Sequence, residues 1–262
     1  VRLVGVVGGD FPDESINFLK EKEIDLEGLQ VKENGKTFHW HGKYDFDLNK
    51  RESLVTELNV FADFNPVVPE SFKKSSYVCL GNINPELQKK VLFQVEKPKL
   101  VVADTMNFWI ESKYNELLDT LRYIDVLIIN DSEARELSRE ANLIKAAKSI
   151  QSMGPKIVII KKGEHGALLF TENNLFSAPA YPLESIYDPT GAGDSFAGGF
   201  IGYIAKTDDL SYDNLKRAVI YGSAVASFAV EKFSLDGIKD LSQIEIKDRF
   251  NEFISFSAFS VN

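Results

Sequence analysis

Short apolar runs alternate with amphipathic stretches along most of the chain. Each run has the length and the apolar, β-branched content of a buried strand, and the stretches between the runs carry apolar residues at helical spacing. The pattern predicts strands at residues 1–7, 77–80, 99–103, 126–129 and 156–160. Strands and helices that alternate in this way are typical of an α/β fold, and we expect a doubly wound, mainly parallel sheet with helices on both faces.

Residues 28–47 break this alternation. Aromatic residues lie at alternate positions around Trp40, as in a strand with one apolar face, and Asn34-Gly35 is a strong hairpin signal. We therefore expect a small antiparallel hairpin at about 28–47. The polar residues 49–58 that follow favour a helix.

The most informative stretch covers residues 188–200 and reads Asp-Pro-Thr-Gly-Ala-Gly-Asp-Ser-Phe-Ala-Gly-Gly-Phe. Gly191 and Gly193 have no side chains to cover their amide N–H groups. A helix that starts at about Asp194 adds unpaired N–H groups and the positive end of its dipole. Together these features predict a concave anion site suited to a phosphate.

The carboxylate of Asp194 does not fit a plain phosphate cradle, because it repels an anion. It makes chemical sense as the base that accepts the proton of a hydroxyl attacking that phosphate, and a helix N-terminus keeps it ionised. The alternative is a glycine-rich turn in which Asp194 caps the helix. The full length of the motif favours the catalytic interpretation.

The first part of this stretch, from Asp188 to Phe196, resembles the signature of the PfkB, or ribokinase-like, carbohydrate kinases. The resemblance implies phosphorylation of a sugar or nucleoside hydroxyl by ATP, with Asp194 as the catalytic base. It implies an anion hole built from the amides of Gly191, Ala192, Gly193 and Asp194. By the same resemblance, the hairpin at 28–47 would be a lid over the acceptor; its aromatic face also fits contact with a second copy of the chain, as in a homodimer.

The resemblance extends to the nucleotide and its cations. Asn130 and Glu133 resemble the family's Asn-x-x-Glu motif, which helps to place Mg²⁺ and the phosphates. The turn after the strand at 156–160 would lie beside the phosphates, where Lys161 or Lys162 could neutralise charge. The implied nucleotide-binding residues are Asn130, Glu133, Lys162, Gly163, Gly166 and Thr190. Glu133 and Asp188 would be the metal ligands, with a monovalent-cation site near Asp188 and Thr190.

Candidate acceptor-binding residues lie in two other places. Asp104 and Asn107 follow a predicted strand, and open α/β sheets bind ligands at the carboxyl ends of their strands; Asp104 could equally cap the turn. Asp10 ends a Gly-x-x-Gly-x-Asp segment that in the family follows an earlier strand, a sugar-binding aspartate and a Gly-Gly-x-x-x-Asn motif. Those parts do not precede it here, so either the sequence is a piece of a longer protein or its acceptor pocket is reduced.

Composition limits the other possibilities. The 262 residues include 30 Lys and Arg against 39 Asp and Glu, and this net charge of −9 argues against nucleic-acid binding through a general positive field. The one cysteine, Cys79, excludes an intrachain disulfide and suits a reducing cytoplasm, and its apolar neighbours predict a buried thiol. No apolar run approaches the roughly 20 residues of a membrane span. We therefore expect a cytoplasmic protein without membrane contact, folded as a single domain over residues 1–262.

These observations favour an enzyme that moves the γ-phosphate of ATP to a hydroxyl of a sugar or sugar-like molecule. Two alternatives stay open, an adenosine-like nucleoside kinase and a non-catalytic protein that binds ATP or a sugar. An oxidoreductase on a similar sheet and a P-loop NTPase are disfavoured, because neither Gly-x-Gly-x-x-Gly nor Gly-x-x-x-x-Gly-Lys-Ser/Thr occurs in the sequence.

Overall fold

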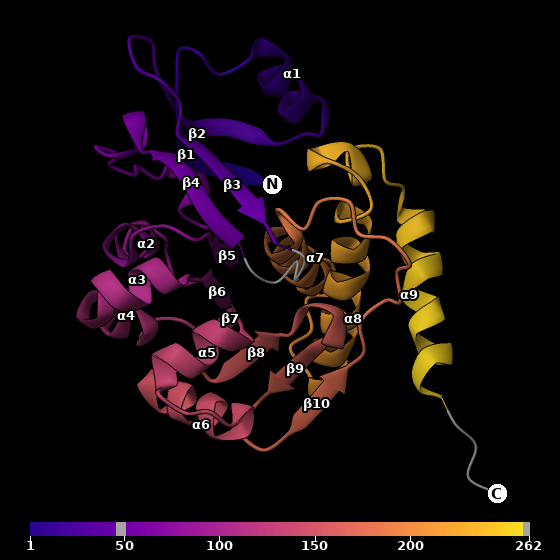
Figure 1. The fold of residues 1–262 in the computed structure, drawn as a ribbon. Helices are drawn as coiled ribbons and strands as arrows, with labels where there is room; N and C mark the ends of the chain where they lie inside the picture. Colours follow the sequence, from indigo (N-terminus) through magenta and orange to yellow (C-terminus); the bar gives the residue numbers. More distant parts are fainter. Residues whose placement is uncertain (46–50, 259–262) are drawn as a thin grey trace, which may run out of the picture. The chain divides into compact units, whose positions relative to one another are not determined.

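The structure is a computed structural model that describes residues 1–45 and 51–258 (Figure 1). The chain forms two compact units. The first consists of Val1–Ser76 and Leu87–Pro98, and the second consists of Tyr77–Glu86 and the chain from Lys99 onward. The single domain expected over residues 1–262 stays a prediction.

The second unit is built on a six-stranded sheet with the strand order β10-β9-β8-β7-β6-β5. Neighbouring strands from β5 to β8 pair in parallel, and β9 and β10 extend the sheet with antiparallel pairs. The strands are β5 (Tyr77–Leu80), β6 (Leu100–Asp104), β7 (Val126–Asn130), β8 (Ile157–Lys161), β9 (Ala167–Phe170) and β10 (Leu175–Ala178). The mainly parallel sheet expected from the sequence is therefore confirmed.

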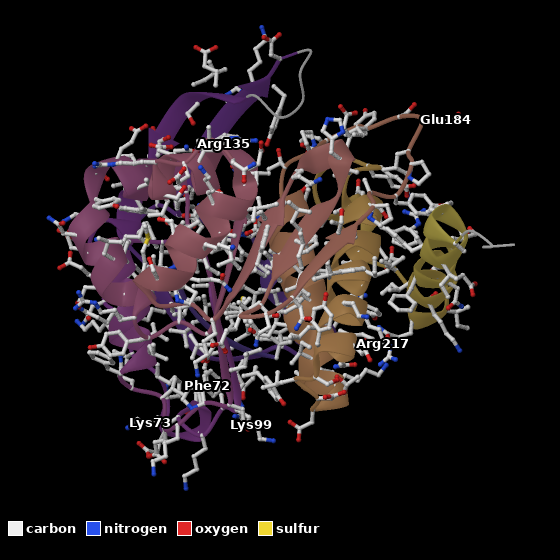
Figure 2. The ribbon with its side chains drawn as sticks, turned by 90° about the horizontal axis from the view of Figure 1, so that it is seen from below. Phe72, Lys73, Lys99, Arg135, Glu184 and Arg217 are labelled. Atoms are coloured by element: carbon white, nitrogen blue, oxygen red, sulfur yellow. The ribbon has the colours of Figure 1, made fainter. Side chains whose placement is uncertain are left out.

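Helices cover both faces of this sheet, as the sequence predicts. In Figure 2, Arg135 on α5 and Arg217 on α8 lie on opposite sides of the sheet. Residues 87–92 of the helix α2 (Pro85–Leu92) belong to the first unit. The helices that follow α2 are α3 (Asn107–Ser112), α4 (Tyr114–Leu121), α5 (Asp131–Ser138), α6 (Leu143–Met153), α7 (Ala192–Thr207), α8 (Tyr212–Ala229) and α9 (Gln243–Ser257). In the part of the chain that the structure describes, no helix has the length and apolar character needed to cross a membrane.

Side-chain alternation decides which residues of the sheet face α7 and α8. One core cluster joins residues from both helices to alternate strand residues, including Leu100 and Val102 of β6 and Val126 and Ile128 of β7. The intervening residues of the same strands are also buried, so both faces of the sheet are apolar. Buried parallel strands of this kind read as continuous apolar runs, which is why the sequence pattern locates them well.

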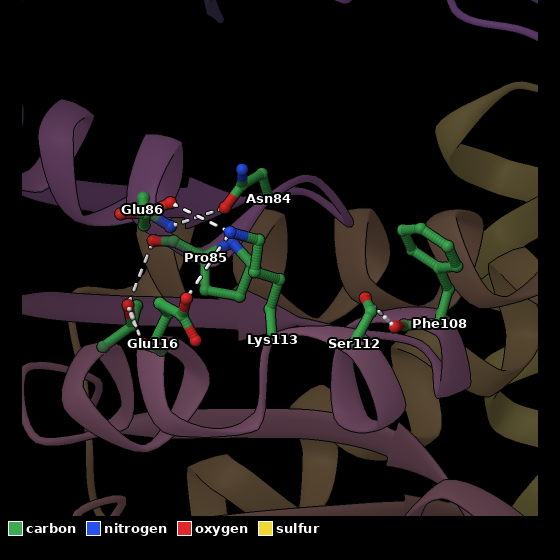
Figure 3. A network of polar contacts seen from close by, with 8 residues as sticks. Asn84, Pro85, Glu86, Phe108, Ser112, Lys113 and Glu116 are labelled. Carbon is green, nitrogen blue, oxygen red and sulfur yellow. Dashed lines mark hydrogen bonds and ion pairs between the residues drawn. The ribbon is translucent and has the colours of Figure 1, made fainter.

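A single residue, Lys113, separates α3 from α4. This residue has a non-helical backbone, with φ −136° and ψ 38°, and α4 begins directly after it. Its ammonium lies between two carboxylates, 3.6 Å from Glu86 and 3.4 Å from Glu116, as Figure 3 shows. The resulting network joins the start of α2 to the α3–α4 junction, and α3 is the helix that follows Asp104.

The first unit begins with a strand–helix–strand motif. Strands β1 (Arg2–Gly8) and β2 (Asp25–Lys32) pair in parallel and are connected by α1 (Asp13–Glu21). A separate antiparallel pair is formed by β3 (His39–Tyr44) and β4 (Arg51–Glu57). The short helices η1 (Asn59–Phe61) and η2 (Glu70–Phe72) follow β4.

The hairpin expected at 28–47 is therefore wrong in its pairing. Strand β2 pairs with β1, and the Asn34-Gly35 turn packs against the end of β1 instead of joining β2 to β3. Gly8 permits this packing, because a Cβ atom on it would lie 2.3 Å from the carbonyl oxygen of Gly35. Residues 51–57 of the helix expected at 49–58 form β4 instead, since they pair with β3; residues 49 and 50 lie outside the described residues. The lid role stays a prediction.

Candidate active site

The start of α7 leaves backbone donors without acceptors. The residue before the helix is Gly191, which has no side chain that could accept a hydrogen bond from the first N–H groups of the helix. The amide of Ala192 donates to the carbonyl oxygen of Pro189 at 3.2 Å. Among the described residues, the amides of Gly191, Gly193 and Asp194 have no acceptor. These N–H groups, with the positive end of the helix dipole, form a site that can bind an anion.

The two glycines at this site differ in what a side chain would encounter. Gly191 has φ +78°, in the left-handed region, and nothing lies within 4 Å of a Cβ atom built on it. The requirement there is conformational. A Cβ atom on Gly193 would lie 2.8 Å from the Nζ atom of Lys161. A side chain at position 193 would therefore displace the lysine ammonium, which is the end of a flexible side chain.

Three neighbouring strands of the sheet each have a polar residue at their carboxyl end, beside α7. Asp104, Asn130 and Lys161 are the last residues of β6, β7 and β8. All three are in phase with the strand residues that pack on α7 and α8. Asn130 and Lys161 are direct partners in the sheet register, and Nζ of Lys161 lies 4.0 Å from Oδ2 of Asp104. The carboxyl ends of parallel strands thus assemble a polar cluster, as the sheet geometry requires.

Asp194 lies in the first turn of α7 and is exposed. Its carboxylate accepts no hydrogen bond from the described residues. Burial, together with the negative charges of Asp104 and Asp194, raises the pKa of the Cys79 thiol to about 11. Cys79 therefore lies near both carboxylates and stays protonated at neutral pH, so that it is no nucleophile.

The buried position expected for Cys79 is wrong. Its side chain is exposed, because in the four-residue strand β5 the buried phase is taken by Val78 and Leu80. Protein atoms nevertheless surround the thiol densely enough to desolvate it, and this desolvation is the largest cause of its raised pKa.

Asn130 and Glu133 form a capping box at the start of α5. The Asn130 side chain accepts a bond from the amide of Glu133, and Oε2 of Glu133 accepts one from the amide of Asn130, each at 2.8 Å. This arrangement gives both residues a structural role; their nucleotide-binding and metal-binding roles stay predictions. Within residues 1–45 and 51–258 no group of three His, Cys, Asp or Glu side chains is arranged to hold a metal ion.

The turn after β8 is tight, and local geometry explains its glycines. Gly163 and Gly166 have φ values of +55° and +80°. A Cβ atom on Gly166 would also lie 2.1 Å from the carbonyl oxygen of Ala178. The amide of Lys162 closes the turn by donating to the carbonyl oxygen of Gly166 at 2.7 Å. Binding of nucleotide by these three residues stays a prediction.

Asp188 connects the segment that leads into α7 to the segment that follows α8. Its carboxylate accepts the amide of Thr190 at 2.9 Å and the amide of Ser234, at the start of η4 (Ser234–Gly237), at 3.2 Å. Burial alone would raise the pKa of Asp188, but these bonds and one from the Thr190 side chain lower it. The metal and monovalent-cation roles of Asp188 and Thr190 stay predictions, and a cation there would share carboxylate oxygens that already accept N–H groups.

The candidate acceptor residues are in separate units and are already engaged. In the first unit, Asp10 accepts the amide and the hydroxyl of Thr37, each at 2.7 Å, and these bonds lower its pKa. In the second unit, the Asn107 amide donates to Glu136, and Oδ1 of Asp104 accepts the following amide at 2.8 Å. Asp10 also borders a cavity of about 340 Å³ within the first unit, whose lining includes Lys36, Phe38, His39, Glu57 and Asn59. Acceptor binding by all three residues stays a prediction.

Two further residues of this region, Lys161 and Thr105, have polar groups at the site. Lys161 was only an alternative to Lys162, although strand alternation would have selected it, because Lys162 falls in the opposite phase. Thr105 was missed: it is 3% exposed, and its hydroxyl has no partner in the described part of the chain. A buried hydroxyl without a partner is uncommon and marks a place for a water molecule or a ligand group.

A family comparison agrees with this geometry. The model of the pfkB family carbohydrate kinases matches residues 1–239. The chain belongs to this family. A cytidine kinase from Thermococcus kodakarensis is 33% identical over 208 residues, which cover 77% of this chain and 72% of that protein. A PfkB member with such relatives is a kinase of the carbohydrate and nucleoside class.

Solved structures confirm the fold. The nucleoside kinase of Methanocaldococcus jannaschii, an archaeal member of the ribokinase family, matches with a TM-score of 0.77 and 21% identity, over 96% of this chain and 80% of that one. An Escherichia coli structure described as a ribokinase II in complex with ATP and Mg²⁺ gives a TM-score of 0.78 at 21% identity, over 96% and 83%. The ribokinase-like α/β fold expected from the sequence is confirmed.

Proposed function

We propose that this PfkB kinase transfers the γ-phosphoryl group of ATP to a hydroxyl of a nucleoside. The observation that supports the proposal most directly is the start of α7. There the exposed carboxylate of Asp194 stands beside amides that have no acceptor among the described residues. The nucleoside is favoured as acceptor because relatives of this chain are named cytidine kinase and nucleoside kinase. A free sugar is the second candidate, since a ribokinase is also a relative.

The chain's own groups can stabilise the transferring phosphoryl group and can accept the proton of the acceptor hydroxyl. The amides of Gly191, Gly193 and Asp194, with the dipole of α7, bind the oxygens of the transferring group and stabilise the charge that develops on it. The acceptor oxygen bonds to phosphorus while the bond from phosphorus to the leaving ADP breaks. Asp194 takes the proton that the acceptor hydroxyl loses.

ATP and Mg²⁺ are the cofactors of this proposal, supported by the family and by the complex of the E. coli structure. Mg²⁺ would neutralise negative charge on the phosphates. Glu133 and Asp188 are the carboxylates that would hold it, directly or through water. Asn130, Lys162, Gly163, Gly166 and Thr190 complete the proposed nucleotide contacts, and a monovalent cation at Asp188 and Thr190 remains part of the proposal.

An acceptor panel tests the reaction. Purified protein with ATP and Mg²⁺ is offered cytidine, uridine, adenosine, inosine, ribose and fructose, and the ADP released is measured with a coupled assay. We expect the highest kcat/KM for one of the nucleosides. The highest value for a free sugar would shift the assignment to the second candidate. Tight ATP binding with no ADP released for any acceptor would contradict the kinase assignment and favour a non-catalytic binding protein.

The base is tested by Asp194→Asn. We expect turnover to fall by about 10²- to 10⁴-fold, the usual contribution of a general base, while ATP affinity measured by calorimetry stays close to that of the wild type. Asp248→Asn, an exposed aspartate on α9, is the matched control and should retain activity. Wild-type turnover in Asp194→Asn would refute the role.

A further inference from the structure

Lys161 is held in an unusual setting for a lysine. Its side chain is 18% exposed, and the side chain of Asp104, its ionic partner among the described residues, is 14% exposed. The closest Nζ–Oδ2 distance is 4.0 Å, which is an ion-pair contact but not a hydrogen bond. Among the residues that the structure describes, the three N–H donors of this ammonium have no hydrogen-bond acceptor.

Such an arrangement does not suit a purely structural ion pair. An ammonium on a mostly buried side chain is most stable when its donors meet acceptors with good geometry, and a single carboxylate at 4.0 Å leaves them unmet. The Nζ atom also lies against the Cα atom of Gly193, whose amide is one of the bare donors of α7. Ammonium and amides therefore converge on one place from two elements, β8 and α7, and all are donors that an anion would satisfy.

We propose that Lys161 binds the phosphoryl group during its transfer, and that Asp104 is a positioning residue that holds the ammonium against Gly193. This inference rests on the proposed function and adds a cation to it. The ammonium offsets negative charge on the transferring group while phosphorus bonds to the acceptor oxygen and separates from ADP. The hydroxyl proton passes to Asp194.

Two substitutions test the role of Lys161. Lys161→Met keeps the length of the side chain and removes its charge, and we expect kcat to fall by about 10²-fold or more. Lys161→Arg keeps the charge and should recover part of that loss. Lys156→Met is the matched control, because this exposed lysine precedes the opposite end of the same strand. Thermal melting checks that each variant is folded.

A binding measurement separates contact with the transferring group from a structural role. Calorimetry with Mg²⁺ compares the ATP analogue AMP-PNP with ADP, which lacks the group in question. We expect Lys161→Met to weaken AMP-PNP relative to ADP by about tenfold or more, the range of a hydrogen bond to a charged group. Equal losses for both nucleotides, or a wild-type kcat, would overturn the assignment. A loss confined to Lys162→Met would also overturn it and move the role to that residue.

The same measurement keeps the two proposals apart. If the wild-type protein phosphorylates no acceptor, the proposed function fails, but the AMP-PNP to ADP ratio still tests Lys161 because it needs no turnover. Asp104 is tested by kinetics: Asp104→Asn should lower kcat with little change in the KM of the acceptor, and Asp104→Glu should recover part of the rate. A raised acceptor KM with unchanged kcat would instead show Asp104 to be an acceptor-binding residue, and would overturn its positioning role.

Discussion

The helices α5 and α7 both start beside the cluster of strand ends, but they treat their first N–H groups in opposite ways. At α5 the chain satisfies its own donors, because Asn130 and Glu133 exchange hydrogen bonds in a capping box. At α7 the residue before the helix is Gly191, which has no side chain to cap with. A glycine-rich helix start therefore indicates an anion site only where neighbouring groups also favour an anion, as the ammonium of Lys161 does here.

An absent side-chain cap is not by itself diagnostic. Helices α1, α3 and α4 also lack one, whereas α6, α8 and α9 are capped by Asn142, Ser211 and Ser242. A side-chain cap contributes about 1 kcal/mol to stability. The start of α7 lacks that contribution, because its N-cap residue is Gly191.

The largest effect on activity is expected from a methyl group at position 193. We expect Gly193→Ala to fold normally, because the atom that its Cβ would meet is the end of a flexible side chain. The displaced ammonium and crowded amides should lower kcat by about 10²- to 10³-fold. Gly198→Ala is the matched control, since nothing lies within 4 Å of a Cβ atom at that helical position. It should be active and more stable by about 1 kcal/mol. An unchanged kcat in Gly193→Ala would mean that the space around Gly193 is not needed for the transfer.

The capped helices provide the next test. Asn130→Ala and Asn142→Ala each remove an N-cap, so urea denaturation should show a loss of about 1 kcal/mol in the free energy of unfolding for both variants. If Asn130 also binds nucleotide, only Asn130→Ala should raise the KM of ATP. Equal, purely thermodynamic effects would leave Asn130 as a cap and remove it from the nucleotide site.

The smallest effect is expected at Cys79. With a thiol pKa of about 11, iodoacetamide should react slowly at pH 8 and faster as the pH rises, because the thiolate is the reactive form. Asp194→Asn removes a negative charge that disfavours the thiolate, so it should lower the pKa and increase the labelling rate modestly. The rate is followed by mass spectrometry over a pH series. An unchanged or higher pKa in Asp194→Asn would mean that this carboxylate lies farther from the thiol than the structure places it.

The sequence predicted the second unit better than the first. Buried parallel strands leave apolar runs that identify them whatever their neighbours are, so β6, β7 and β8 were predicted within a residue or two. In the first unit, Asn34-Gly35 indicated a hairpin, but the pairing of β2 depends on how closely the turn can approach Gly8. That approach is a contact between distant residues, and local propensity carries no information about it.

The candidate site shows the same division. Motif spacing located Asp194 and the glycines, and the strand-end rule located Asp104. What the sequence could not supply was the contact between elements: Nζ of Lys161 lies against Gly193, which is on another element and 32 positions farther along the chain. Cys79 was misplaced for a related reason, since a four-residue strand is too short for its apolar run to show which phase is buried.

The contact between Lys161 and Gly193 also constrains how this chain can diverge. A larger residue at either position encounters the other, so the two sites tolerate change together more readily than apart. A descendant that replaces the lysine with a short side chain gains room for alanine at the glycine, whereas in one that keeps the lysine an alanine there would displace the ammonium. Substitution patterns at these two sites should therefore be correlated in lineages that descend from this protein.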